Sequence, residues 1–183
     1  NITFYNEQLH PFEKKYQRID WDATAAEKNG YPDFMLKEMY EQPSTVRETI
    51  GTRVTAGAPT QMDGLDFTAA QLQNLHQIYI IGCGTAMHAG LAAKPMFEHL
   101  THIPTQVDVA SEFRYRDPLV DDRTLCIFIS QSGETADTIA ALRLAKAAGA
   151  ATLAVSNVIG SSITREADYT VYTHAGPEIA VAS

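Results

Sequence analysis

The chain has 183 residues, of which 45% are hydrophobic and 20% are charged, with a formal net charge of −8. This length and composition are typical of one soluble globular domain that is large enough to bury a proper core. The negative charge argues against nucleic acid as a partner, because nucleic-acid binding needs a basic surface that displaces counterions from the phosphates.

No apolar run reaches the roughly 18–20 residues of a membrane span, and no signal peptide is apparent. We therefore expect a cytoplasmic protein that does not contact a membrane. The two cysteines, Cys83 and Cys126, are expected to be reduced thiols in that compartment, and one strained disulfide is the alternative.

The first part of the chain, residues 1–32, is polar, rich in tyrosine and interrupted by proline and glycine, which predicts a linker. From residue 33, apolar residues at near-helical spacing predict a helix that ends at Gln42. Pro43 suits the first turn of a second short helix that ends at residue 50. The chain starts without a methionine and stops after GPEIAVAS, so we expect a piece of a longer protein.

A regular alternation of helices and strands follows. Thr68 and Gln71 have the spacing of a capping box, which predicts a helix that ends at Leu75. Short apolar segments predict strands over 77–82, 105–110, 124–130, 151–157 and 169–173. Helices are predicted over 85–101, 111–116, 135–148 and 161–167, with a kink or a division at Pro95. The alternation predicts an α/β fold with a three-layer, doubly wound, parallel five-stranded sheet.

One loop of this pattern is suited to an anion. The predicted strand that ends at residue 130 runs into SQSGET, and a helix follows directly. Ser130 and Ser132 offer hydroxyl donors, Gly133 permits a close approach, and Thr135 can donate while it caps the helix. Backbone amides of residues 131–135 would add the favourable dipole of a helix N-terminus. The loop therefore predicts a phosphate site held by hydrogen bonds alone, and a simple helix-capping loop is the alternative.

A second loop, GCGTAMHAG over residues 82–90, lies at the carboxyl end of another predicted strand, where sheets of this type bind ligands. Its two glycines allow a ligand near the backbone. Met87 stands where a dinucleotide fingerprint needs its third glycine, which argues against a nicotinamide or flavin cofactor. Cys83 is interpreted as a packed thiol beside the site. No metal is expected, because His99 and His102 share a helical face without a third ligand.

Several long segments in this order resemble the sugar-isomerase (SIS) domain family. They are GCGTAMHAGLAAK, ASEFRYRDPLV, ISQSGETADTIAALR, SNVIGSSITREAD and YTHAGPEIAVAS. Within that family they are similar to the isomerase half of the glutamine–fructose-6-phosphate aminotransferases. Upstream, FMLKEMYEQP and IDWDATAAEKNGY are similar to the segment that precedes this half. The resemblance covers nearly the whole chain from about Ile19 and implies a flavodoxin-like sheet, preceded by a helical and linker segment.

The resemblance implies an enzyme that makes glucosamine 6-phosphate from fructose 6-phosphate and glutamine without a cofactor. Residues 1–32 would be the linker from a glutaminase domain, 33–76 a helical segment of the isomerase domain, and 77–183 the first of two SIS subdomains. The family's catalytic residues belong to the second subdomain and the glutaminase domain. This chain is therefore expected to bind the phosphosugar, to be inactive alone and to form a homodimer.

By motif position, the resemblance assigns the sugar-phosphate contacts to residues of three segments. Ser130, Gln131, Ser132 and Thr135 match the phosphate loop, with Gly133 and Glu134 as weaker candidates. Cys83, Gly84 and Thr85 match the glycine-rich strand end, and Val181 and Ser183 match positions that touch the sugar. Ala86 stands where the family usually has serine, and the missing hydrogen bond to a charged acceptor would cost about 1.5–3 kcal/mol.

Two other functions fit the same loops. A regulatory module would sense a sugar phosphate, although residues 1–76 lack the basic cluster of a DNA-binding segment. A stand-alone sugar-phosphate isomerase would need acid–base groups of its own, for which His88, Glu134 and Glu178 are the candidates.

Overall fold

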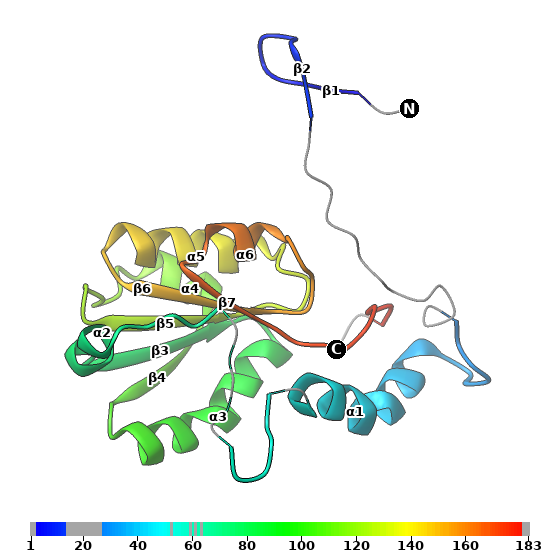
Figure 1. The fold of residues 1–183 in the computed structure, drawn as a ribbon, viewed down its shortest axis with the longest axis horizontal. Coiled ribbons are helices and arrows are strands. Elements are labelled where there is room, and N and C mark those ends of the chain that lie inside the picture. The colour runs from blue at the N-terminus through cyan, green and yellow to red at the C-terminus, as the bar shows by residue number, and fades with distance from the viewer. Residues whose placement is uncertain are drawn as a thin grey trace.

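A parallel five-stranded sheet forms the centre of the computed structural model, which describes residues 3–13, 27–51, 53–58, 60, 62 and 64–180 (Figure 1). The strands are β3 (Gln77–Gly82), β4 (Thr105–Val109), β5 (Thr124–Ile129), β6 (Ala151–Ser156) and β7 (Tyr169–Tyr172). Their spatial order is β4-β3-β5-β6-β7, and every neighbouring pair is parallel. This is the flavodoxin-like order when the count begins at β3, so the predicted sheet is confirmed.

Helices cover both faces of the sheet and make the three layers that were predicted. They are α3 (Thr85–Thr101), α4 (Ala110–Tyr115), α5 (Ala136–Ala147) and α6 (Ser162–Glu166). Figure 1 shows α4, α5 and α6 on one face and α3 on the other. Successive residues of β3 alternate between the two cores: Tyr79 and Ile81 pack under α4 and α5, whereas Ile78 and Ile80 face the α3 side. The central strands β3 and β5 are mostly apolar because both of their faces are buried, whereas the edge strand β4 (TQVDV) carries polar residues.

Most predicted boundaries agree with the structure to within one or two residues. The capping box is confirmed at α2 (Ala69–Asn74), where Thr68 is the N-cap and Gln71 bonds back to it. Helix α3 continues through Pro95, so the alternative of two shorter helices is wrong. Gly149 follows α5 with a φ of 90°, a left-handed conformation that glycine adopts without strain.

The two short helices predicted on either side of Pro43 are a single helix, α1 (Phe34–Gly51). A proline inside a helix removes one backbone donor. Next to it, the Ser44 hydroxyl donates to the Glu41 carbonyl at 2.7 Å and the Thr45 hydroxyl to the Gln42 carbonyl at 3.1 Å. The prediction of a break was wrong because Pro43 lies inside a continuous helix rather than in the first turn of a second one.

A short hairpin lies within the part of the chain that was predicted as a linker. Strands β1 (Phe4–Tyr5) and β2 (Pro11–Phe12) pair antiparallel. The Asn6 carboxamide oxygen accepts from the amides of Gln8 and His10 at 3.1 and 2.8 Å, which closes the turn. Residues 14–26 of the predicted linker lie outside the described residues. No helix in the described part of the chain is long and apolar enough to cross a membrane.

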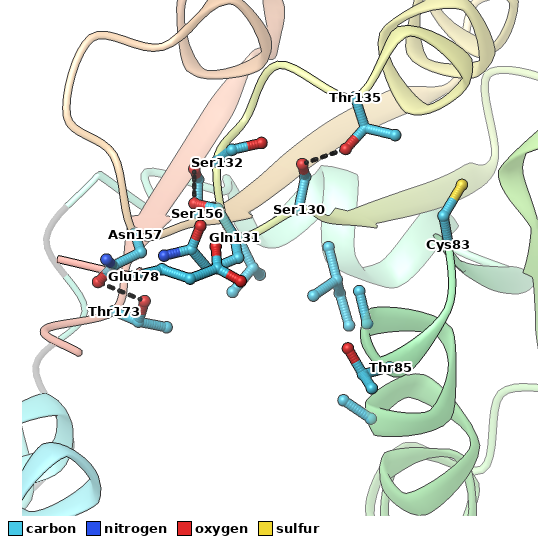
Figure 2. Close-up of a pocket in the computed structure, with 14 residues that line it drawn as sticks. Cys83, Thr85, Ser130, Gln131, Ser132, Thr135, Ser156, Asn157, Thr173 and Glu178 are labelled. Atoms are coloured by element: carbon cyan, nitrogen blue, oxygen red, sulfur yellow. Dashed lines mark hydrogen bonds between the residues drawn. The ribbon is translucent and has the colours of Figure 1, made fainter. Parts of the chain in front are cut away.

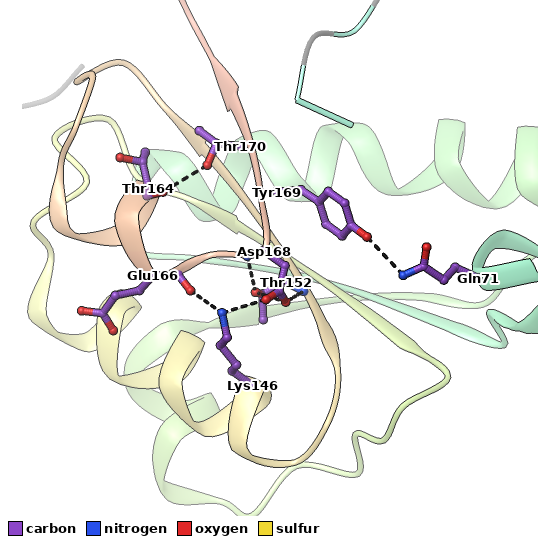
Figure 3. Close-up of polar contacts among 8 residues, drawn as sticks. All are labelled: Gln71, Lys146, Thr152, Thr164, Glu166, Asp168, Tyr169 and Thr170. Carbon is purple, nitrogen blue, oxygen red and sulfur yellow. Dashed lines mark hydrogen bonds and ion pairs between the residues drawn. The ribbon is translucent and has the colours of Figure 1, made fainter. Parts of the chain in front are cut away.

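Helices α5 and α6 are tied to the start of β7 by Lys146 and Asp168 (Figure 3). The Lys146 ammonium donates to the Glu166 carbonyl at 2.7 Å and pairs with the Asp168 carboxylate at 2.7 Å. The other oxygen of that carboxylate accepts from the amide and the hydroxyl of Thr152 at 3.0 and 2.7 Å. Burial raises the pKa of Asp168, but the bonds from Lys146 and Thr152 outweigh it and hold that pKa below its usual value.

This lowered pKa predicts a loss of stability in acid. The ionised Asp168 stabilises the fold above the pKa that it has in the unfolded chain, about 3.9, and this contribution disappears as the pH falls through the lower folded pKa. We expect the free energy of unfolding of the wild type to fall more steeply between about pH 5 and pH 2 than that of Asp168→Asn. Urea denaturation at each pH checks this, and parallel pH profiles would contradict it.

Candidate functional site

A cavity of about 460 Å³ opens at the carboxyl ends of β3, β5 and β6 (Figure 2). The chain leaves β3 for a helix on one face of the sheet and leaves β5 for a helix on the other, so the two loops diverge. A crevice at such a reversal is the usual ligand site of this fold. Its lining residues are Cys83, Thr85, Ala86, Ala89, Ile129, Ser130, Gln131, Ser132, Thr135, Val155, Ser156, Asn157, Thr173 and Glu178.

The loop between β5 and α5 is held in shape by its own serines. The Gly133 amide donates to the Ser130 hydroxyl at 3.1 Å, and the Glu134 amide donates to the Ser132 hydroxyl at 3.2 Å. These two amides were predicted to face an anion, and here they fix the loop instead. A hydroxyl that accepts such a bond keeps its own proton to donate. Ser130 and Ser132 line the cavity, so the loop presents preorganised hydroxyl donors there.

Thr135 is the N-cap residue of α5, but its side chain makes no capping hydrogen bond, and that part of the prediction is wrong. Its hydroxyl lies 3.3 Å from the Ser130 hydroxyl, across the loop (Figure 2). Because the side chain points across the loop, it lines the cavity rather than covering the first turn of its helix.

Gly133 and Glu134 are not among the described residues that line the cavity. Gly133 has a φ of 67°, and a Cβ there would collide with the Ser161 side chain. The Glu134 carboxylate turns away to α6, where it accepts from the Ser162 amide at 2.8 Å. That bond from the backbone holds the pKa of Glu134 below its usual value. The Glu134 carboxylate thus accepts from the first amide of α6 and does not face a ligand in the cavity.

The loop between β3 and α3 supplies the opposite wall. Cys83, Thr85 and Ala86 line the cavity. Gly84, with a φ of 55°, is the N-cap residue before α3 and is not among the described lining residues. The Cys83 sulfur lies 3.8 Å from the Thr138 hydroxyl of α5. Both cysteines are free thiols, as predicted. Cys126 is buried in the sheet, and this burial raises the pKa of its thiol to about 12, which makes it inert.

Sequence reasoning missed Ser156, Asn157 and Thr173, which line the cavity from the ends of β6 and β7. Figure 2 shows Asn157 and Thr173 across the cavity from Cys83 and Thr85. The signal was present: polar residues directly follow the apolar strand next to β5, and the carboxyl ends of neighbouring parallel strands meet at one edge of the sheet.

Asn157 connects three segments of the site. It is 5% exposed, and its backbone amide donates to the Gln131 carbonyl at 3.1 Å. Its side-chain oxygen accepts from the Thr173 hydroxyl at 3.2 Å and the Ala175 amide at 2.9 Å, while its side-chain nitrogen donates to the Gly176 carbonyl at 2.6 Å. Asn157 therefore holds the phosphate-loop candidate Gln131 through its backbone and the segment after β7 through its side chain.

Truncation of Asn157 is expected to destabilise the protein. In Asn157→Ala, two donors and one acceptor lose their buried partner, which predicts a loss of about 1–3 kcal/mol in the free energy of unfolding. Asn74→Ala, at an exposed asparagine at the end of α2, is the control and should change it by less than about 0.5 kcal/mol. Urea denaturation measures both, and equal effects would contradict the role given to Asn157.

The described lining carries little charge. Glu178 is its one carboxylate, and it includes no lysine, arginine or histidine. His88, the other candidate base, is not part of this lining. Val181 and Ser183, which were predicted to touch a sugar, lie outside the described residues. A ligand in this cavity would be held chiefly by hydroxyl, amide and backbone groups, which suits a sugar with one phosphate better than a dinucleotide.

Known proteins resemble the chain over its whole length. The family model described as the SIS domain matches residues 71–183, more than half of the chain. The glutamine–fructose-6-phosphate aminotransferase (isomerizing) of Clostridium acetobutylicum is 54% identical over 182 residues, which cover 100% of this chain and 30% of that protein. The protein of the same name from Streptomyces coelicolor is 50% identical over 94% of this chain and 28% of its own length. The chain thus spans about 30% of the length of the curated relatives it matches.

Solved structures agree with this. The C-terminal domain of glucosamine-fructose-6-phosphate aminotransferase from Francisella tularensis superposes with a TM-score of 0.76 at 43% identity, over 86% of this chain and 44% of that one. Tagatose-6-phosphate ketose/aldose isomerase from Escherichia coli shares the fold, with a TM-score of 0.62 at 16% identity over 85% of this chain and 42% of that one. The family match, the order of the strands and the place of the cavity agree: the chain belongs to the SIS domain family.

Proposed function

We propose that the chain binds a phosphosugar in the cavity between β3, β5 and β6, as the first half of an isomerase domain. The observation that carries this proposal is the preorganised row of hydroxyls, Ser130, Ser132 and Thr135, at the start of α5 and inside the cavity. Hydroxyl donors and the positive end of a helix dipole stabilise a phosphate without a basic side chain.

In this proposal the phosphate lies against Ser130, Gln131, Ser132 and Thr135. The sugar extends toward the loop of Cys83, Gly84 and Thr85. Val181 and Ser183, which lie outside the described residues, are proposed to contact the sugar as well. Gly133 acts only through the shape of the loop. Ala86 contributes its backbone amide, because it has no hydroxyl to donate.

The whole protein is proposed to be a glutamine–fructose-6-phosphate aminotransferase, as its relatives are named. The reaction opens the sugar ring, replaces the carbonyl oxygen at C2 by ammonia-derived nitrogen, and moves a proton from C1 to C2. These steps need general acids and bases within hydrogen-bond reach of C1 and C2. This chain would hold and orient the phosphate end while groups from other segments act on the reacting carbons. Alone it is proposed to be inactive.

The proposed division of the chain follows from the same resemblance. Residues 1–32 would be the linker from a glutaminase domain, 33–76 the helical segment of the isomerase domain and 77–183 the first SIS subdomain. We also propose a cytoplasmic location and a homodimer. Sedimentation equilibrium tests the dimer, and a single monomeric species at high protein concentration would contradict it.

A calorimetric titration tests the binding proposal. Fructose 6-phosphate and glucosamine 6-phosphate are expected to bind saturably, inorganic phosphate more weakly, and NAD not at all. Tight NAD binding would overturn the proposal. If nothing binds, Ala86→Ser restores the family's hydroxyl, and a variant that still binds no sugar phosphate would reject a phosphate site in this chain.

A stand-alone isomerase is less well supported. Of its three candidate acid–base residues, only Glu178 lines the cavity, because His88 is not among the described lining residues and Glu134 is bonded to Ser162.

A further inference from the structure

The segment after β7 is anchored to α1. The His174 amide donates to the Thr49 hydroxyl at 3.0 Å, and the amides of Ile179 and Ala180 donate to the Glu38 carboxylate at 2.9 and 3.0 Å. Figure 1 shows this segment running from β7 to the side of α1. Two helix residues more than two turns apart therefore fix the path of the chain beside the cavity.

Glu38 makes the stronger of these two anchors. One carboxylate oxygen, Oε1, accepts from two successive amides, and hydrogen bonds to an ionised acceptor are roughly twice as strong as neutral ones. Ile179 and Ala180 are not part of a strand, and their amides bond to Glu38 rather than to a neighbouring strand. Without Glu38, the amides of Ile179 and Ala180 would be satisfied only by water, and the segment would no longer be held at this point.

The anchored segment forms part of the cavity wall. Glu178, next to the two anchored amides, lines the cavity, and so does Gln131. The same two residues line a smaller groove of about 180 Å³ against α1, and Glu38 lies on that groove. Glu38 is not among the described residues that line the cavity itself. Any effect of Glu38 on a ligand therefore passes through the segment that it holds.

We infer that Glu38 is a positioning residue for the sugar end of the ligand, a claim that rests on the proposed function. The phosphate loop has its own bonds, from the Gly133 amide to Ser130 and from the Glu134 amide to Ser132, and does not depend on α1 for them. Loss of the Glu38 anchor should therefore weaken the binding of the sugar and leave the binding of the phosphate largely unchanged. A purely structural role would weaken both alike.

The test compares fructose 6-phosphate with inorganic phosphate on the 183-residue chain by calorimetry. In Glu38→Ala the Kd for fructose 6-phosphate should rise about tenfold, which corresponds to about 1.4 kcal/mol, while the Kd for inorganic phosphate stays within about twofold. Glu38→Gln keeps an oxygen that accepts both amides and should stay within about threefold of the wild type, because only the charge is lost. Glu112→Ala, at an exposed carboxylate of α4 that is not among the described lining residues of the cavity or the groove, is the control and should change neither constant.

Hydrogen exchange gives a second readout that needs no ligand. The amides of Ile179 and Ala180 should exchange faster in Glu38→Ala than in the wild type or in Glu38→Gln. Equal weakening of both ligands, or unchanged binding of both, would overturn the positioning role while leaving the proposed function in place. If neither the wild type nor Ala86→Ser binds fructose 6-phosphate or inorganic phosphate, the proposed function is overturned, and the role of Glu38 with it.

Discussion

Gly133→Ala is expected to lower the free energy of unfolding by about 2–5 kcal/mol. A left-handed backbone conformation costs a residue with a side chain about 1–2 kcal/mol, and crowding in a packed interior costs about 1–3 kcal/mol more. Both apply here, because Gly133 has a φ of 67° and its Cβ would collide with the side chain of Ser161, which is 3% exposed. Urea denaturation measures the change.

Gly57→Ala separates the two causes. Gly57 has a φ of 77° but no neighbouring atom within 4 Å of the position of a Cβ. Only the backbone cost applies, so the expected loss is about 1–2 kcal/mol. Similar losses of unfolding free energy in the two variants would mean that the phosphate loop does not pack tightly against Ser161. That result would contradict the rigidity of the loop, on which the proposed site depends.

Ser132→Ala combined with Thr135→Ala is expected to abolish measurable binding of fructose 6-phosphate. Each hydroxyl that donates to a charged phosphate contributes about 1.5–3 kcal/mol. The loss of two predicts a rise of about two to four orders of magnitude in Kd, since each 1.4 kcal/mol is about tenfold. Calorimetry with fructose 6-phosphate and inorganic phosphate measures the effect, and both ligands should be affected because the phosphate itself loses its donors.

The matched control removes two hydroxyls that bond within their own helices. The Ser44 hydroxyl donates to the Glu41 carbonyl and the Thr101 hydroxyl to the Phe97 carbonyl, each at 2.7 Å. Ser44→Ala with Thr101→Ala should leave both dissociation constants unchanged. Unchanged binding in the cavity variant, with its melting temperature intact, would show that the hydroxyls do not hold the phosphate.

The sheet was predictable from the sequence because both of its faces are buried. The central strands β3 and β5 are then nearly continuous apolar runs, and such runs are visible without knowledge of their partners. The two loops at the switch point were found for a related reason: their glycines and hydroxyl residues interrupt the apolar pattern at the ends of strands.

The missed features depend on contacts that are distant in sequence. In the sequence, Asn157 is only a polar residue that follows a strand. Its role becomes visible in the structure, where its side chain bonds to Thr173 and Gly176. From the sequence alone, Glu134 is a candidate general acid in the loop. Only the position of α6 shows that its carboxylate accepts a hydrogen bond from the Ser162 amide. Thr135 has the residue type of a helix cap, but its hydroxyl is directed across the loop to Ser130. The local conformational preferences of these residues do not determine where their side chains point.

A crystal structure of the chain with fructose 6-phosphate tests the proposed site most directly. We expect the phosphate within hydrogen-bond distance of the hydroxyls of Ser130, Ser132 and Thr135, with the sugar between Thr85 and the segment after β7. A phosphate bound elsewhere, or held by lysine or arginine side chains outside this cavity, would contradict it.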